Sequence, residues 1–163
     1  MKLKGNQKGF TLIEVLVTVG ILGAIMGVLS MTVISIMIIT PRTNDWAIAL
    51  RQVQNAGYWI SRDVLMSQIV TPAQNPGDPL VALEWDDGDG THYEVDYVVT
   101  DDDELRRELN GASPGILIAQ YIVGVGTDTT FVDDGNNKYM LTVKASHGDA
   151  EVGRVYQVTP RPD

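Results

Sequence analysis

Cysteine is absent from the 163 residues of the chain. This absence excludes disulfide bonds, cysteine nucleophiles and thiolate metal sites. Only two histidines occur, His92 and His147, and each is alone in its neighbourhood. A zinc site needs three or four ligands, usually in recognisable spacing. We therefore expect two surface histidines, no metal site and no cofactor.

Sequence motifs of common enzymes are also missing. The chain has no Gly-x-Ser-x-Gly elbow and no phosphate-binding glycine loop of the Walker or Rossmann form, so we expect that it is not an enzyme. Three acidic groups could offer oxygen ligands to calcium: Asp86–Gly90, Asp101–Glu104 and Asp133–Asn137. An EF-hand starting at Asp87 fails, because His92 stands where glycine is required and Val98 where the last glutamate should be. Solvated turns explain the groups well, and calcium binding stays the alternative.

Positive charge is scarce beyond Thr40, where 9 Lys and Arg stand against 20 Asp and Glu, a balance of −11. Phosphate contacts need a basic face, so we expect no nucleic-acid contact for this chain. An acidic surface also keeps a domain soluble, and this is the simpler interpretation.

One segment has no charge at all, the 25 residues from Val15 to Ile39. As a helix it would be about 37 Å long, enough to cross a bilayer core of about 30 Å with some tilt. Lys2, Lys4 and Lys8 precede the run without any acid. Because positive flanks stay in the cytoplasm, we expect a single-pass protein of the cytoplasmic membrane with its C-terminal part outside.

A secretory signal and a plain anchor both explain this segment less well. The apolar core of a signal peptide has about 7–15 residues, and the only small-x-small sequence nearby, Ala47–Ala49, lies well beyond the run. A plain anchor explains the lysines and the apolar run, but it does not explain Glu14, a carboxylate near the start of the run.

The residues from Lys8 to Glu14, KGFTLIE, resemble the cleavage and methylation motif of type IV prepilins, shared by pilins and by the pseudopilins of type II secretion. The resemblance implies that a prepilin peptidase cuts between Gly9 and Phe10 and that Phe10 becomes N-methylphenylalanine. It also implies that Glu14 pairs with the N-terminus of a neighbouring subunit during assembly. An unperturbed α-amino group has a pKa near 7.7–8.0 and would supply the cation. The alternative is a glutamate that snorkels to the headgroups.

Small residues recur in the apolar run. Gly20, Gly23 and Gly27 have spacings that let helices approach closely in lipid, and Gly23-x-x-x-Gly27 has the GxxxG form. We expect them to pack against other helices, although glycine is also common in membrane helices for no such reason.

Beyond the apolar run, the sequence predicts a second, amphipathic helical part that ends near Thr71-Pro72. Pro41 is expected to kink or interrupt the helix, and Thr43, Asn44 and Asp45 to cap a renewed one. Ser61, Arg62 and Asp63 are placed largely on the polar side. The stripe expected to be buried consists of Trp46, Leu50, Val53, Gly57, Ile60 and Val64.

After a loop rich in Pro, Asn and Gly, the apolar period changes to two. Residues 81–86 and 93–99 flank Gly88-Asp89-Gly90 and predict a β-hairpin. Residues 104–109 (ELRREL) predict a short helix or a third strand, and several β-rich segments follow. The expected fold is α+β, a long N-terminal helix packed on an antiparallel β-sheet domain as in pilins. The expected parts are a leader (1–9), a transmembrane and assembly helix (10–40), an amphipathic half-helix (41–71) and a β-rich domain (72–163).

A looser resemblance covers residues 54–70 and ELRREL, which are similar to the minor subunits related to the J pseudopilin and the W pilin. It implies a minor subunit of a pilus or pseudopilus. Its partners would be other pilins or pseudopilins, the prepilin peptidase, the inner-membrane assembly platform and membrane lipid. The alternative is a single-pass anchored domain that binds sugar or calcium outside the cytoplasm and does not assemble.

Overall fold

The computed structural model describes residues 9–75 and 77–161. Lys2, Lys4 and Lys8 of the expected leader lie outside the described residues. The chain divides into two compact units, Met1–Pro41 and Arg42–Asp163, and each is described by itself.

The long helix α1 extends from Leu12 to Val64 and includes Pro41 within it. Proline has no N–H to donate to the carbonyl of Met37, yet the helix is assigned without a break at this point. Of the two predicted effects of Pro41, an interruption of the helix is therefore wrong, and a kink stays a prediction. Thr43, Asn44 and Asp45 lie inside α1 and begin no renewed helix.

The helix ends at Val64, seven residues before the predicted end near Thr71. The Ser67 hydroxyl donates to the carbonyl of Val64 at 2.8 Å, and the Ser67 backbone N–H donates to the carbonyl of Asp63 at 3.0 Å. These bonds satisfy carbonyls that the last turn of a helix leaves without partners. The chain then enters strand β1, Ile69–Pro72, so the predicted boundary between helix and β-rich domain is corrected.

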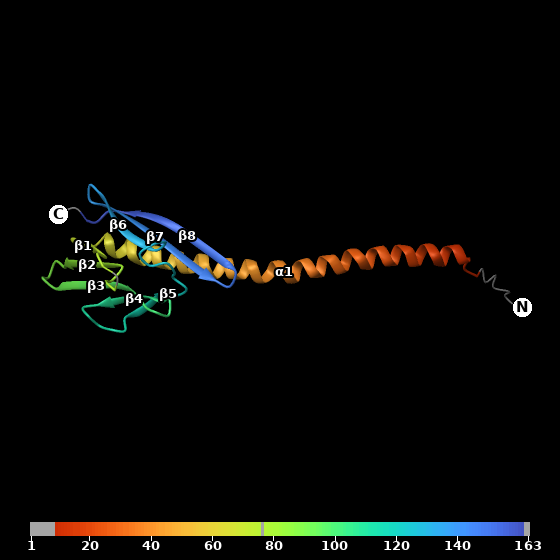
Figure 1. Ribbon diagram of the computed structural model, residues 1–163, viewed down its shortest axis with the longest axis horizontal. Coiled ribbons are helices and arrows are strands. Elements are labelled where there is room, and N and C mark those ends of the chain that lie inside the picture. Colours follow the sequence, from red (N-terminus) through yellow and green to blue (C-terminus); the bar gives the residue numbers. More distant parts are fainter. Residues whose placement is uncertain (1–8, 76, 162–163) are drawn as a thin grey trace, which may run out of the picture. The chain divides into compact units, whose positions relative to one another are not determined.

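Two antiparallel sheets follow the helix where the sequence predicted one (Figure 1). The five-stranded sheet has the order β1-β2-β3-β4-β5, with β2 at Val81–Asp86, β3 at His92–Val99, β4 at Leu105–Leu109 and β5 at Ile116–Ala119. The three-stranded sheet has the order β6-β7-β8, with β6 at Thr130–Gly135, β7 at Lys138–His147 and β8 at Ala150–Val158. The predicted hairpin is confirmed as β2–β3, with Asp86 opposite His92, and ELRREL contributes the third strand, β4, rather than a helix.

The core of Arg42–Asp163 forms where one face of α1 packs against residues of both sheets. The helix contributes Ala49, Val53, Ala56, Ile60 and Val64, and the strands contribute residues such as Leu83, Tyr97, Leu141 and Val143. The predicted stripe is confirmed from Val53 onwards, whereas Trp46 is 50% exposed. The prediction that Asp63 lies on the polar side is wrong, because its side chain is fully buried. Alternating steps of four and three residues lead from Ala49 to Asp63, and residues at this spacing share one face of a helix.

At Gly57, α1 lies directly against the Tyr156 side chain of β8. A Cβ atom at this position would lie 2.2 Å from Cζ of Tyr156. The Tyr156 ring is held there, because it is half-buried and its hydroxyl donates to the carbonyl of Val53 at 3.2 Å. Glycine is therefore required at residue 57 by packing.

We expect Gly57→Ala to lower the free energy of unfolding. Overpacking costs about 1–3 kcal/mol and outweighs the roughly 1 kcal/mol that alanine gains over glycine inside a helix. The matched control is Gly153→Ala in β8, where the nearest atom to a Cβ is the Val143 carbonyl oxygen at 3.8 Å. Denaturant unfolding of the full chain in detergent measures both variants. Equal stability of the two variants would contradict this packing argument.

Candidate functional site

The predicted cleavage site, Gly9-Phe10, lies in exposed, non-helical backbone just before α1. The side chain of Phe10 is 84% exposed. A Cβ at Gly9 would meet no atom of the described residues within 4 Å, so their packing does not itself require glycine there. The peptide bond between the two residues is accessible to an enzyme without any unfolding of α1.

The start of α1 is closed by a capping box made by Thr11 and Glu14. The Glu14 backbone N–H donates to the Thr11 hydroxyl at 3.3 Å, and the Thr11 backbone N–H and hydroxyl donate to Oε2 of Glu14, each at 3.3 Å. In such a box two N–H groups that the first helical turn leaves unpaired are satisfied reciprocally. This capping role was not among the sequence-based predictions, although the signal T-x-x-E before an apolar run is present in the sequence.

The capping box fixes the Glu14 carboxylate at the first turn of the helix, four residues from Phe10 in sequence. Its hydrogen bonds use Oε2 alone, and Oε1 has no bond among the described residues. A carboxylate oxygen has two lone pairs, so this group can hold its own helix start and still accept a hydrogen bond from a cation.

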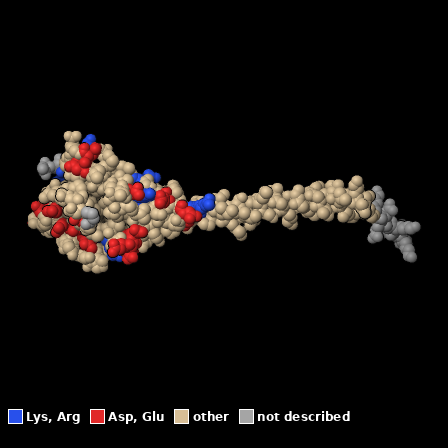
Figure 2. Space-filling model, in the orientation of Figure 1, with Lys and Arg blue, Asp and Glu red and all other residues tan. Residues whose placement is uncertain are grey.

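The rest of α1 up to Pro41 exposes apolar side chains all round. Its large hydrophobic residues from Phe10 to Ile39 are 49–85% exposed in this chain. The face drawn in Figure 2 shows neither red nor blue along most of this segment. By length and composition α1 is long and apolar enough to cross a membrane, with a mean hydropathy of 2.4 in its most apolar window. A helix that is apolar on every side suits lipid or a helix bundle.

Four of the five hydroxyl groups within this segment donate hydrogen bonds to their own helix. Thr18, Ser30, Thr32 and Thr40 donate to backbone carbonyls three or four residues earlier, at 2.7–3.0 Å. Such bonds matter in hydrocarbon, where a polar group without a partner costs several kcal/mol.

Gly20, Gly23 and Gly27 lie on one face of α1. At about 100° per residue they fall within an arc of about 60°. A Cβ at any of the three would meet no atom within 4 Å, so no contact with the part of the chain that the structure describes requires glycine. Their role in packing against another helix stays a prediction.

A buried charge cluster ties α1 to the five-stranded sheet. The Tyr97 hydroxyl donates to Oδ2 of Asp63 at 2.8 Å, and Nε of Arg107 donates to the same oxygen. The Asp63 side chain is 1% exposed and that of Arg107 is 13% exposed. Oδ1 of Asp63 has no hydrogen-bond partner within the described part of the chain. Asp63 therefore depends on β3 and β4 for its partners.

The pKa values in the cluster follow from burial and charge. Burial, then the charge and hydrogen bond of Asp63, raise the pKa of Tyr97 well above its usual value. Burial lowers the pKa of Arg107, but the hydrogen bond and charge of Asp63 outweigh this and leave it raised. Tyr97 therefore stays protonated and Arg107 charged in the folded chain, the states that both donate to Asp63.

The raised pKa of Tyr97 makes stability depend on alkaline pH. Above about pH 10 the tyrosine of the unfolded chain loses its proton while folded Tyr97 keeps it, so the free energy of unfolding falls as pH rises. One proton corresponds to about 1.36 kcal/mol per pH unit. We expect Tyr97→Phe to make the fall in the free energy of unfolding between pH 10 and 11 less steep, by the amount that corresponds to about one proton. Denaturant unfolding at several pH values measures it, with exposed Tyr58→Phe as control, and an unchanged slope in Tyr97→Phe would disprove the linkage.

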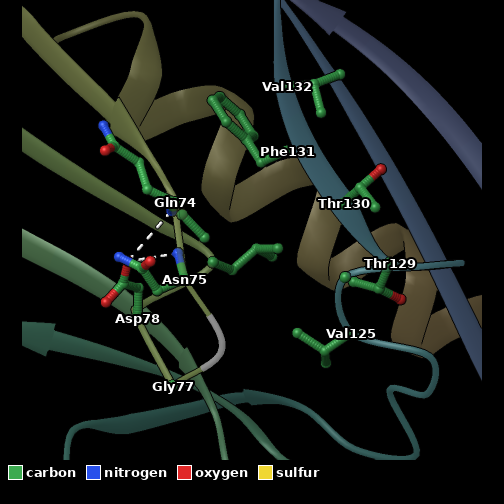
Figure 3. A pocket seen from close by; sticks show the side chains of 12 residues that line it. Gln74, Asn75, Gly77, Asp78, Val125, Thr129, Thr130, Phe131 and Val132 are labelled. Atoms are coloured by element: carbon green, nitrogen blue, oxygen red, sulfur yellow. Dashed lines mark hydrogen bonds between the residues drawn. The ribbon is translucent and has the colours of Figure 1, made fainter.

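A cavity of about 360 Å³ lies between the connection from β1 to β2 and strand β6 (Figure 3). Its lining combines Phe131 and Val132 with the polar loop residues Gln74, Asn75 and Asp78. Oδ2 of Asp78 already accepts the backbone N–H groups of Asn75 and Gln74, at 2.8 and 3.2 Å, and these bonds lower its pKa. Calcium takes 6–8 oxygen ligands, and this one occupied carboxylate does not supply such a set.

The remaining acidic groups and histidines form no metal centre in the described ranges, where no three His, Asp or Glu side chains gather around a common point. His92 is exposed as predicted, and Nδ1 lies 2.8 Å from Oδ1 of Asp86, a hydrogen bond that raises its pKa. His147 is half-buried rather than on the open surface, because it packs edge-on against Tyr121 and lies 3.2 Å from Asp45.

Comparison with known proteins gives one match. Residues 4–30 match the family model described as the prokaryotic N-terminal methylation motif. No curated protein and no solved structure matches the chain. The matched range covers the predicted cleavage site, the Thr11–Glu14 capping box, and Gly20, Gly23 and Gly27 of α1. The matched range includes the start of α1, and the order of one long helix followed by antiparallel sheets is consistent with the pilin fold.

Proposed function

We propose that this chain is a structural subunit of a type IV pilus or of a type II secretion-like pseudopilus. It is cut between Gly9 and Phe10, methylated at Phe10, held in the cytoplasmic membrane with its C-terminal unit outside, and then assembled through α1. The observation that carries the proposal is the match to the methylation motif, within which Gly9 and Phe10 lie in exposed, non-helical backbone just before an apolar helix.

Four glycines of the N-terminal segment support this proposal, because packing within the described residues does not account for them. Among the described residues, Gly9, Gly20, Gly23 and Gly27 have no contact that requires glycine, in contrast to Gly57. A peptidase that approaches the backbone explains Gly9, and close packing of neighbouring helices explains the other three. Both explanations need partners outside the chain: the prepilin peptidase, other pilins or pseudopilins, the inner-membrane assembly platform and lipid.

More narrowly, we propose a minor subunit of the J pseudopilin or W pilin type. The two segments that carry this resemblance are joined in the structure, because Asp63 of the first bonds Arg107 of the second. The competing proposal, an anchored domain that binds sugar or calcium and never assembles, requires neither the cut after Gly9 nor methylation of Phe10. Processing therefore separates the two.

We expect Gly9→Leu to abolish processing, because a side chain keeps the peptidase from the backbone at the cut. The matched control is Gly5→Leu, which adds the same side chain within the leader and should be processed. Electrophoresis of membranes from cells that contain the prepilin peptidase separates precursor from mature chain. If Gly9→Leu matures as fully as Gly5→Leu, the proposed cleavage site is wrong.

A further inference from the structure

A groove of about 590 Å³ lies between the exposed face of α1 and the edge strand β8. Its lining includes Gly57, Tyr58, Arg62, Leu65, Arg154 and Tyr156. β8 pairs only with β7, so its other edge has no strand beside it in the order β6-β7-β8. All lining residues belong to the unit Arg42–Asp163.

The groove places two cations on an acidic unit. Arg62 and Arg154 are exposed and form no ion pair with any described residue, whereas Arg106, Arg107 and Lys144 each contact a carboxylate. Arg62 lies 5.3 Å from the centroid of the Trp59 ring, a cation–π contact that leaves its N–H groups available. The groove therefore offers hydrogen-bond donors with positive charge to a negatively charged group.

Exposed aromatic and apolar side chains lie beside these cations. Tyr58 is 63% and Leu65 60% exposed. Tyrosine and arginine are enriched among the residues that dominate binding energy in protein interfaces. The combination suits a protein surface with both carboxylates and an apolar side chain.

The chain itself carries acidic groups of this kind on another surface. Asp101 and Asp102 lie in the turn between β3 and β4 of the five-stranded sheet, are exposed and form no ion pair with the rest of the described chain. The face drawn in Figure 2 shows several clusters of red on this unit. Groove and turn thus have opposite charge and belong to different sheets.

We propose that the groove binds the turn Asp101–Asp103 of a second copy of this chain, with carboxylates facing Arg62 and Arg154. This inference rests on the proposed function, because a filament grows through heterologous contacts, in which two different surfaces of identical chains meet. It requires at least two adjacent copies in one filament, so it rests on the broader proposal of a pilus or pseudopilus subunit and not on the narrower J or W type.

The absence of cysteine makes a direct test possible. Two full-length copies with different tags are produced together in membranes that contain the assembly machinery. One carries Ser61→Cys in the groove and the other Asp102→Cys in the turn, and mild oxidation should give a mixed disulfide. Thr127→Cys, in an exposed turn outside the groove, replaces Ser61→Cys as the matched control and should give none.

Charge reversal tests the chemistry of the contact. Arg62→Asp with Arg154→Asp in the first copy should lower the disulfide yield at least about tenfold, a change of about 1.4 kcal/mol. Asp101→Arg in the second copy should then restore most of the yield. The inference is overturned if charge reversal leaves the disulfide yield unchanged. It is also overturned if the groove cysteine crosslinks only to a different subunit. Cysteines at Leu16 in both copies report helix contact: if these crosslink while the groove pair does not, copies are adjacent and the groove inference alone fails. If neither pair crosslinks, the groove inference also fails, and the mature N-terminus decides the proposed function separately.

Discussion

Glu14→Ala should insert into the membrane and be cut after Gly9, yet lose its lateral contact with neighbouring subunits. Removing an acid from an apolar helix favours insertion. The lost contact is with the α-amino cation of a neighbouring mature chain. An opposite-charge pair at about 4 Å gains roughly 4 kcal/mol at an effective dielectric of 20, less the desolvation of both groups. A net 1.4 kcal/mol would lower association about tenfold.

The capping box requires controls that separate charge from helix capping. Glu14→Gln keeps a side chain that can accept from Thr11 but removes the charge, so it should fail to associate like Glu14→Ala. Thr11→Val removes the capping hydroxyl and keeps the charge, at a cost of about 1 kcal/mol to the helix start, and should still associate. Crosslinking in membranes at matched protein levels gives the readout. If Glu14→Gln associates like wild type while Glu14→Ala does not, Glu14 acts as a cap and the charge pairing is wrong.

Asp63→Ala should lower the free energy of unfolding by about 3–5 kcal/mol, a large part of the 5–15 kcal/mol typical of a folded protein. The change leaves the buried guanidinium of Arg107 without its carboxylate and the Tyr97 hydroxyl without its acceptor. Denaturant unfolding of the full chain in detergent measures the loss. We expect no such loss in Asp128→Ala, because Asp128 is 55% exposed and its partner Lys144 keeps Glu151 at 3.0 Å.

The double variant Asp63→Leu with Arg107→Met tests the origin of that loss. Because Oδ1 of Asp63 is buried without a partner, the wild-type pair carries an uncompensated desolvation cost. Removing both charges should therefore restore most of the stability lost in Asp63→Ala. A double variant as unstable as the single one would show that shape, rather than an unpaired charge, is what Asp63 supplies.

Local patterns predicted the parts of this fold that local physics determines. The alternation of apolar residues gave the β2–β3 hairpin in its observed position, and the uncharged run gave the exposed apolar half of α1. The predicted end of α1 was too late, because no proline or glycine occurs between Val64 and Pro72 to mark an earlier one. The observed end at Val64 depends on hydrogen bonds made by Ser67.

The buried cluster shows where sequence alone was insufficient. Helical periodicity alone would have put Asp63 on the apolar face, but an acid there is acceptable only with Tyr97 and Arg107 as partners. Those residues lie 34 and 44 positions away, and their approach depends on how β3 and β4 pair. The division into two sheets also arises from long-range pairing that no local pattern reports. At the N-terminus the motif predicted Gly9, Phe10 and Glu14, whereas Thr11 required the capping-box signal to be recognised.

The mature N-terminus tests the central claim most directly. Tandem mass spectrometry of the chain purified from membranes with the prepilin peptidase should identify N-methylphenylalanine derived from Phe10 as the first residue, followed by Thr11. A chain that retains Met1, or one cut near Ala49, would contradict the account.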